Sequence, residues 1–199
     1  MSYITEAINK WGKCRTGAIT MYGAGVGVYG NSGYAYTGST PSKLKKRIEE
    51  ANSSNAEITD INITENGNYV IILGGSGYWT LGYPDAFLKK LEQYRTGDLR
   101  DDNILSACFN DRGEWVVITD KHYSYSNETI KNFILKAEEL YEEVYYAYIT
   151  NYGMIACCKN GVYYKNIPSN LAEALKKLTF KPKVIKFTDN GLYLITDGE

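Results

Sequence analysis

The sequence predicts an α+β fold in which a β-hairpin, a short strand and a helix recur five times and close into a ring with pseudo-five-fold symmetry. Three observations predict it: a glycine at equivalent points of the chain, alternating apolar runs on both sides of each glycine, and amphipathic helical segments between these pairs of runs. A single unit of this size cannot bury its own apolar face, so its neighbours have to cover it. The glycines lie 38 to 46 residues apart and are Gly23, Gly67, Gly113, Gly153 and Gly191.

The second copy has the clearest hairpin. Ile61 and Ile63 alternate with polar residues, which is the pattern of a half-buried strand. The pair Asn66 and Gly67 supplies the positive φ that a tight hairpin turn requires. The run that follows, 70–73, is apolar throughout, as in a strand that is covered on both faces. We therefore expect the second strand of each hairpin to lie deeper than the first.

Helices are predicted to begin near Pro41, Pro84, Asn127 and Pro168. Proline suits the first turn of a helix, and asparagine is a good N-cap. A fifth helix is expected at residues 3–13, where it would complete the C-terminal copy, which ends after its hairpin. The inward stripes are expected to be Leu44, Ile48 and Ala51; Phe87, Leu88, Leu91 and Tyr94; Ile130, Phe133, Ile134, Ala137 and Leu140; and Leu171, Leu175 and Leu178.

The length fits one domain made of these units. Closure into a ring removes exposed sheet edges and the need for capping repeats, whereas an open solenoid, the alternative, leaves an apolar end unit bare. The predicted units span roughly 14–54, 55–98, 99–142, 143–180 and 181–199 together with 1–13.

The composition indicates a cytoplasmic protein that needs no membrane, metal or cofactor. The net charge is -1, the chain has no long apolar run, and its start lacks the order of a secretory signal. Its cysteines show neither a CxxC pair nor a histidine at zinc-ligand spacing, so we expect them to be small buried residues. They are Cys14, Cys108, Cys157 and Cys158.

The functional prediction comes from the 19 tyrosines. Tyrosine gives a binding site a large contact area at little cost in rotamer entropy. Several tyrosines stand just before a helix start in segments expected to be flexible, where a flat ring could stack beside unpaired helix N–H groups. In the alternative, they are strand residues that fill the gaps between units. The predicted ligand-binding residues are Tyr34, Tyr36, Tyr78, Trp79, Tyr83, His122, Tyr123 and Tyr164.

The sequence gives weaker support to catalysis, to an acidic site and to nucleic-acid binding. His122 could act as a general base, but no serine or cysteine completes a triad with it. Asp98, Asp101 and Asp102 are interpreted as a solvated connection between units. The basic residues form only local clusters that acidic residues balance, which does not favour nucleic-acid binding. The chain resembles the pentein type of pseudosymmetric enzyme only in its number of units, so no catalytic residue is assigned from that likeness.

Taken together, the sequence predicts a non-enzymatic binding protein that recognises or sequesters a small polar ligand, either nucleotide-like or a carbohydrate. The alternative is a protein-interaction or inhibitor module, and a homo-oligomer is compatible with both. The Lys, Asn, Ile and Tyr content is typical of an AT-rich genome, and a phage or other mobile element is one such source.

Overall fold

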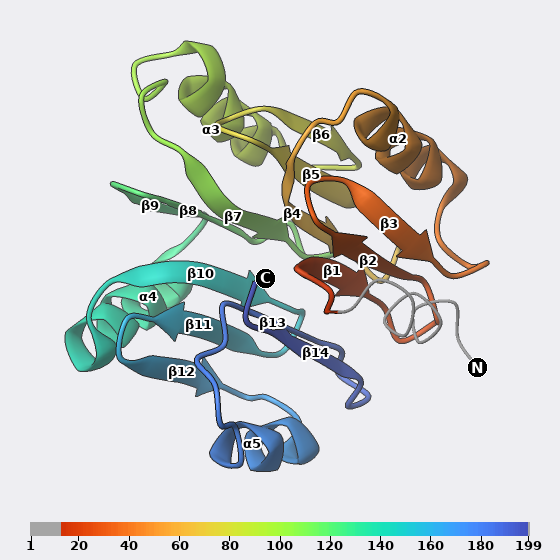
Figure 1. Ribbon diagram of the computed structural model, residues 1–199. Helices are drawn as coiled ribbons and strands as arrows, with labels where there is room; N and C mark the ends of the chain where they lie inside the picture. The colour runs from red at the N-terminus through yellow and green to blue at the C-terminus, as the bar shows by residue number, and fades with distance from the viewer. Residues whose placement is uncertain (1–12, 199) are drawn as a thin grey trace.

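The computed structural model describes residues 13–198, and the helix expected at residues 3–13 falls outside them apart from its last residue. The described chain is α+β, with 14 strands in five small antiparallel sheets and four helices (Figure 1). Four sheets have three strands each, and the last has two. Along the described chain, two strands of a hairpin, a third strand and a helix follow one another four times, and a final pair of strands comes after them.

The first strands of the five sheets are β1 (Thr16–Ile19), β4 (Ile58–Ile63), β7 (Ile104–Phe109), β10 (Val144–Ile149) and β13 (Val184–Phe187). The second strands are β2 (Gly25–Tyr29), β5 (Tyr69–Leu73), β8 (Trp115–Thr119), β11 (Met154–Cys158) and β14 (Tyr193–Thr196). The third strands are β3 (Gly33–Tyr36), β6 (Tyr78–Leu81), β9 (Tyr123–Tyr125) and β12 (Gly161–Lys165). The helices are α2 (Ser42–Ser53), α3 (Asp85–Thr96), α4 (Glu128–Tyr141) and α5 (Ser169–Lys176).

The recurring glycines serve the hairpin turns in two ways. Gly67 has a φ of 80°, and its equivalents at 23, 113 and 191 are also in the left-handed region, which confirms the predicted turn chemistry. Gly153 does not have a positive φ. A side chain there would collide with the backbone carbonyl of Asn166 and the ring of Phe187, so this glycine is needed for close approach instead.

The first strands lie in the middle of the molecule, and the helices lie around the outside (Figure 1). Strand β1 lies against β4, β4 against β7, β7 against β10, β10 against β13, and β13 against β1. This packing buries the first strands as deeply as the second ones, so the expectation that the second strands lie deeper is wrong. In the last sheet the order is reversed, because β13 is fully buried while Tyr193 on β14 is exposed.

The helix starts agree with the sequence to within one residue. Asn127 is the N-cap of α4, and its side-chain oxygen accepts a hydrogen bond from the N–H of Ile130 at 3.0 Å. The three prolines occupy the N-cap position itself rather than the first turn. Two predicted stripe residues are wrong: Leu140 is half exposed near the end of α4, and Leu178 lies beyond the end of α5.

A buried ion pair connects the second and fifth units. The ammonium group of Lys186 on β13 lies 2.8 Å from Asp60 Oδ1 and 2.6 Å from Asn62 Oδ1, and it also donates to the carbonyl of Ile61. The rings of two tyrosines on β10 complete its surroundings, with centroids 5.5 and 5.6 Å from the nitrogen. Burial lowers the pKa of Lys186, and the neighbouring carboxylate opposes that shift.

No helix within residues 13–198 is long and apolar enough to cross a membrane. All four cysteines are buried and unbonded to one another, as expected for small core residues.

Buried thiols and phenols predict a loss of stability at alkaline pH. Burial raises the pKa of Cys108 from 9.0 to about 12, that of Cys158 to about 11, and that of Tyr123 from 10.0 to about 12. These groups stay protonated in the folded state while the unfolded chain releases their protons, so their contribution is full below pH 9 and is lost as the pH rises toward 12. Lys186 acts in the opposite sense, because its pKa is lowered on folding. We expect the urea midpoint to fall between pH 9 and 12.

The variant Cys108→Val is the control for this pH dependence, since it removes a buried ionisable group and keeps a similar volume. It should weaken the slope of the urea midpoint against pH within the same window. A midpoint that stays constant up to pH 11 in the unmodified chain would contradict the prediction.

Candidate functional site

Most of the predicted site tyrosines lie on strands. The sequence places them in flexible segments before the helices, and the structure corrects this, because the third strand of each three-stranded sheet pairs with the second over these residues. Examples of this pairing are Tyr78 with Ile72 and Tyr164 with Ile155. Tyr34 and Tyr36 lie on β3, Tyr78 and Trp79 on β6, Tyr123 on β9 and Tyr164 on β12, while Tyr83 and His122 lie in the adjoining connections.

Three of these tyrosines use their hydroxyl groups within their own unit. In each case the phenol on the third strand donates a hydrogen bond to a glutamate on the following helix, which ties the helix to its sheet. Burial, followed by the glutamate, raises the pKa of Tyr78 well above its usual value. The ring faces of these residues, rather than their hydroxyls, are therefore the parts available to a ligand. The pairs are Tyr36 with Glu49 at 2.8 Å, Tyr78 with Glu92, and Tyr123 with Glu138 at 2.9 Å.

A groove of about 650 Å³ between α2 and α3, over β6, gathers more of the predicted residues than any other described depression. Helix α2 forms one wall, while β6, the turn after it and α3 form the other. Tyr78, Trp79 and Tyr83 all line it. We call it the α2–α3 groove. Its charged lining residues are Lys43, Lys46, Arg47 and Arg95, with Glu50 and Glu92.

Arginine side chains cover two of the aromatic rings in the α2–α3 groove. The guanidinium carbon of Arg47 lies 5.2 Å from the ring centroid of Trp79, and a bond of 2.7 Å to Glu50 fixes its position. The guanidinium of Arg95 lies 5.2 Å from the ring of Tyr78. Such cation–π pairs are each worth roughly 0.5 to 1 kcal/mol at exposed sites.

The groove joins elements from two units. The guanidinium of Arg95 is held by a bidentate contact of 3.0 Å with Glu92, the same carboxylate that accepts the Tyr78 hydroxyl. Arg47, by contrast, reaches across from the preceding unit. Positive charge therefore converges on the aromatic faces of β6 from both walls, and four basic side chains outnumber two acidic ones.

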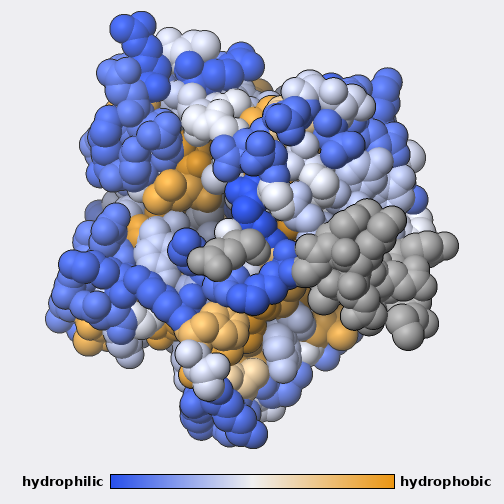
Figure 2. All heavy atoms as spheres, viewed as in Figure 1, coloured by the Kyte–Doolittle hydropathy of each residue, from blue (hydrophilic) through white to orange (hydrophobic). Residues whose placement is uncertain are grey.

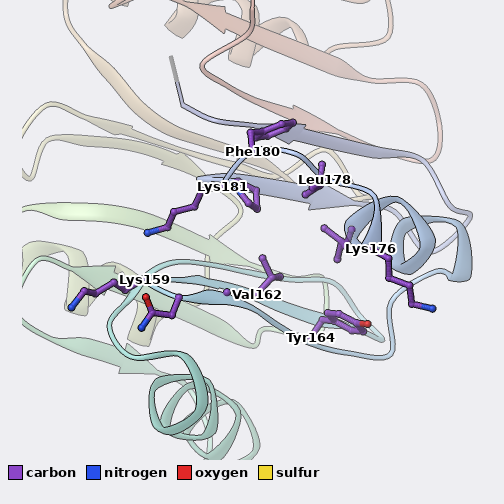
Figure 3. Close-up of a pocket in the computed structure, with 11 residues that line it drawn as sticks. Lys159, Val162, Tyr164, Lys176, Leu178, Phe180 and Lys181 are labelled. Carbon is purple, nitrogen blue, oxygen red and sulfur yellow. The ribbon is translucent and has the colours of Figure 1, made fainter.

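The structure does not bring all eight predicted residues together. Tyr34 lines a separate depression of about 610 Å³, and its ring stacks on Tyr36 at 5.5 Å. Tyr164 lines a third depression, of about 500 Å³, together with Leu178 and Phe180 from the segment that follows α5 (Figure 3). Figure 2 shows the general arrangement: hydrophilic residues cover the peripheral lobes, and hydrophobic residues gather in the furrows between them.

His122 lies apart from these depressions, in a structural pair. Its Nδ1 is 2.5 Å from Oδ2 of Asp102, and its backbone N–H donates to Thr119 Oγ1 at 2.7 Å. Asp102 is only 5% exposed, so its assignment to a solvated connection is wrong. The pair joins the segment before β7 to the turn between β8 and β9, and the two residues are 20 positions apart in the sequence, which is why spacing did not reveal it.

The site residues that sequence reasoning missed are the cations of α2 and α3. The α2 cations were interpreted only as a local basic cluster, and Arg95 of α3 was not considered, although the period of the helix places Lys43, Lys46 and Arg47 beside the apolar stripe of α2. Comparison of the chain with protein-family models, curated proteins and solved structures finds no match, so its function has to be inferred from the geometry of the α2–α3 groove.

Proposed function

We propose that this chain is a non-catalytic binding protein, and that the α2–α3 groove recognises a small anionic ligand with a flat ring, of the nucleotide type. One observation carries the proposal: two guanidinium groups lie over aromatic faces in one groove, and two further lysines stand at its rim. Arginine recognises phosphate through planar, multiple hydrogen bonds, and aromatic faces stack on nucleobases. A neutral carbohydrate would use the rings but not the excess of positive charge.

The size of the groove supports a ligand of this class. Sites for small molecules and cofactors have volumes of roughly 300 to 1,000 Å³ and combine apolar walls with a few polar groups. In the α2–α3 groove, the polar groups are already oriented, because Glu50 and Glu92 hold the two arginines in place. A phosphate could replace these carboxylates as the partner of each guanidinium without moving either helix.

We further propose that the five units close into a ring and that this frame keeps the α2–α3 groove rigid. The cyclic order in which the first strands meet supports the ring. The contact between the ends of the described chain supports it as well, since Thr196 Oγ1 donates to the carbonyl of Cys14 at 2.5 Å.

Loss of affinity on removing one guanidinium tests the proposed function. A nucleoside triphosphate is expected to quench tryptophan fluorescence through Trp79, and Arg47→Ala should weaken its binding about tenfold or more in titration calorimetry. Inorganic triphosphate and the bare nucleoside should each bind more weakly than the nucleotide, since each lacks one half of the recognised chemistry.

Arg112→Ala is the matched control. Arg112 lies 4.8 Å from the ring centroid of Tyr152, outside the α2–α3 groove, so the chain offers a guanidinium–tyrosine pair with no proposed role in binding. Equal effects of the two substitutions would overturn the proposal, and so would an absence of binding across a panel of nucleotides.

The alternative, a protein-interaction or inhibitor module, rests on a different observation. Phe180 and Tyr164 are 43% and 39% exposed beside one depression, and three lysines but no acidic residue line it. If heat-denatured protein releases no small molecule, and a partner protein copurifies with the chain but is lost from Phe180→Asp, this alternative replaces the nucleotide proposal.

A further inference from the structure

Each turn after a first strand has a polar residue at its first position, directly after the strand. In four units the side chain of this residue accepts hydrogen bonds from its own turn, as Thr150 does from the N–H of Gly153 at 3.0 Å. Thr64 is the exception: this residue is only 7% exposed, and its hydroxyl has no hydrogen-bond partner in the structure. The equivalents that do bond their own turns are Thr20, Asn110, Thr150 and Thr188.

Thr64 lines a small cavity of about 20 Å³, which is room for one water molecule or one cation. The residue directly after Thr64 and its equivalents in the three following units also line the cavity, and three of these four residues are acidic. No lysine, arginine or histidine lines this cavity. These four residues are Glu65, Asp111, Asn151 and Asp189.

Three oxygens of the lining side chains are buried without a hydrogen-bond partner: Thr64 Oγ1, Asp111 Oδ1 and Asn151 Oδ1. Some of the remaining carboxylate oxygens already accept hydrogen bonds. Asp189 Oδ1 accepts from Thr150 Oγ1 at 2.9 Å, and both oxygens of Glu65 accept from the backbone N–H of Met21. A buried oxygen without a partner costs free energy, so three beside one cavity favour a water molecule or a cation at this place.

Carboxylates gather at this cavity. Glu65, Asp111 and Asp189 come from three different units and all line it, so three carboxylates lie close together here. Within residues 13–198 no three Asp, Glu, His or Cys side chains form a complete metal-ligand group. Neutral oxygens and water would therefore have to complete the coordination of any ion.

We propose that this cavity binds one calcium ion through Thr64 Oγ1, Asp111 Oδ1, Asn151 Oδ1 and the carboxylate of Asp189, with water as the remaining ligand. Calcium takes oxygen ligands of mixed kind in flexible geometry, whereas magnesium requires a nearly ideal octahedron and retains its waters. The ion would link the turns of four units. This proposal does not depend on the α2–α3 groove.

Terbium luminescence tests the site directly. Terbium replaces calcium chemically, and Tyr148, which lines the cavity, is in place to sensitise its emission. We expect saturable emission at one ion per chain that calcium displaces, and loss of that emission in Asp111→Asn/Asp189→Asn. Emission that does not saturate, or that the double variant retains, would overturn the proposal.

Thermal unfolding provides the second readout. Millimolar calcium added to chelator-treated protein should raise the melting temperature by about 5 °C. The shift should disappear in the double variant and persist in Asp98→Asn, a control that removes one carboxylate outside the cavity. The double variant relieves repulsion between carboxylates, so in chelator it should melt no lower than the unmodified chain. An equal shift in all three proteins would indicate unspecific binding and overturn the proposal.

Discussion

Lys186→Met is expected to lower the free energy of unfolding by about 3 to 5 kcal/mol, as breaking a buried ion pair from one side typically does. The substitution keeps the length of the side chain but removes the ammonium group, so Asp60 stays buried without its positive partner. It also takes a donor from Asn62 and from the carbonyl of Ile61. The midpoint of urea unfolding, followed by circular dichroism, measures the loss.

The double variant Lys186→Met/Asp60→Asn separates the unpaired charge from the lost packing. Asparagine removes the charge, and its oxygen can still accept hydrogen bonds such as the one from the N–H of Ile61, 2.9 Å long in the unmodified chain. We therefore expect the double variant to recover most of the stability that the single variant loses. If both variants are equally destabilised, the cost comes from the shape of the core rather than from the uncompensated carboxylate.

The sequence predicts local structure well and the centre of the molecule poorly. Turn glycines, helix starts and apolar stripes depend on neighbours within a few residues, and Gly67, Asn127 and Ile48 all do what their local patterns indicate. Lys186 alternates with apolar residues, which normally indicates a solvent-facing position. Its partner Asp60 is 126 residues away, and only the packing of first strands against one another shows that β13 is buried on both faces.

Only the aromatic part of the candidate site could be predicted from the sequence. Tyr78, Trp79 and Tyr83 follow from their place in the repeat, but Arg47 comes from the preceding unit and reaches Trp79 only because α2 packs between two sheets. One signal was available: a helix glutamate follows the third-strand tyrosine after 13 to 15 residues in three units. This spacing indicates that the phenol hydroxyls hold helix to sheet and leaves the ring faces as the binding surface.

Removal of residues 183–199 is expected to abolish cooperative unfolding. In an open array each unit contacts only its neighbours, so loss of the last unit subtracts one interface and leaves the others intact. In the proposed ring, β13 contacts both β10 and β1, and its removal exposes the sides of two further units. We expect the truncated chain to lose its near-ultraviolet circular dichroism and its sharp thermal transition.

The truncation also removes Lys186, so it should be made in the Asp60→Asn background, with the full-length Lys186→Met/Asp60→Asn chain as the reference. The difference between these two proteins then reports the contacts of β13 and β14 without an unpaired buried carboxylate in either. A truncated chain that still melts in one sharp transition, a few degrees below the reference, would identify an open solenoid. Loss of the transition would instead mean that the first and last units stabilise each other, as closure of the ring requires.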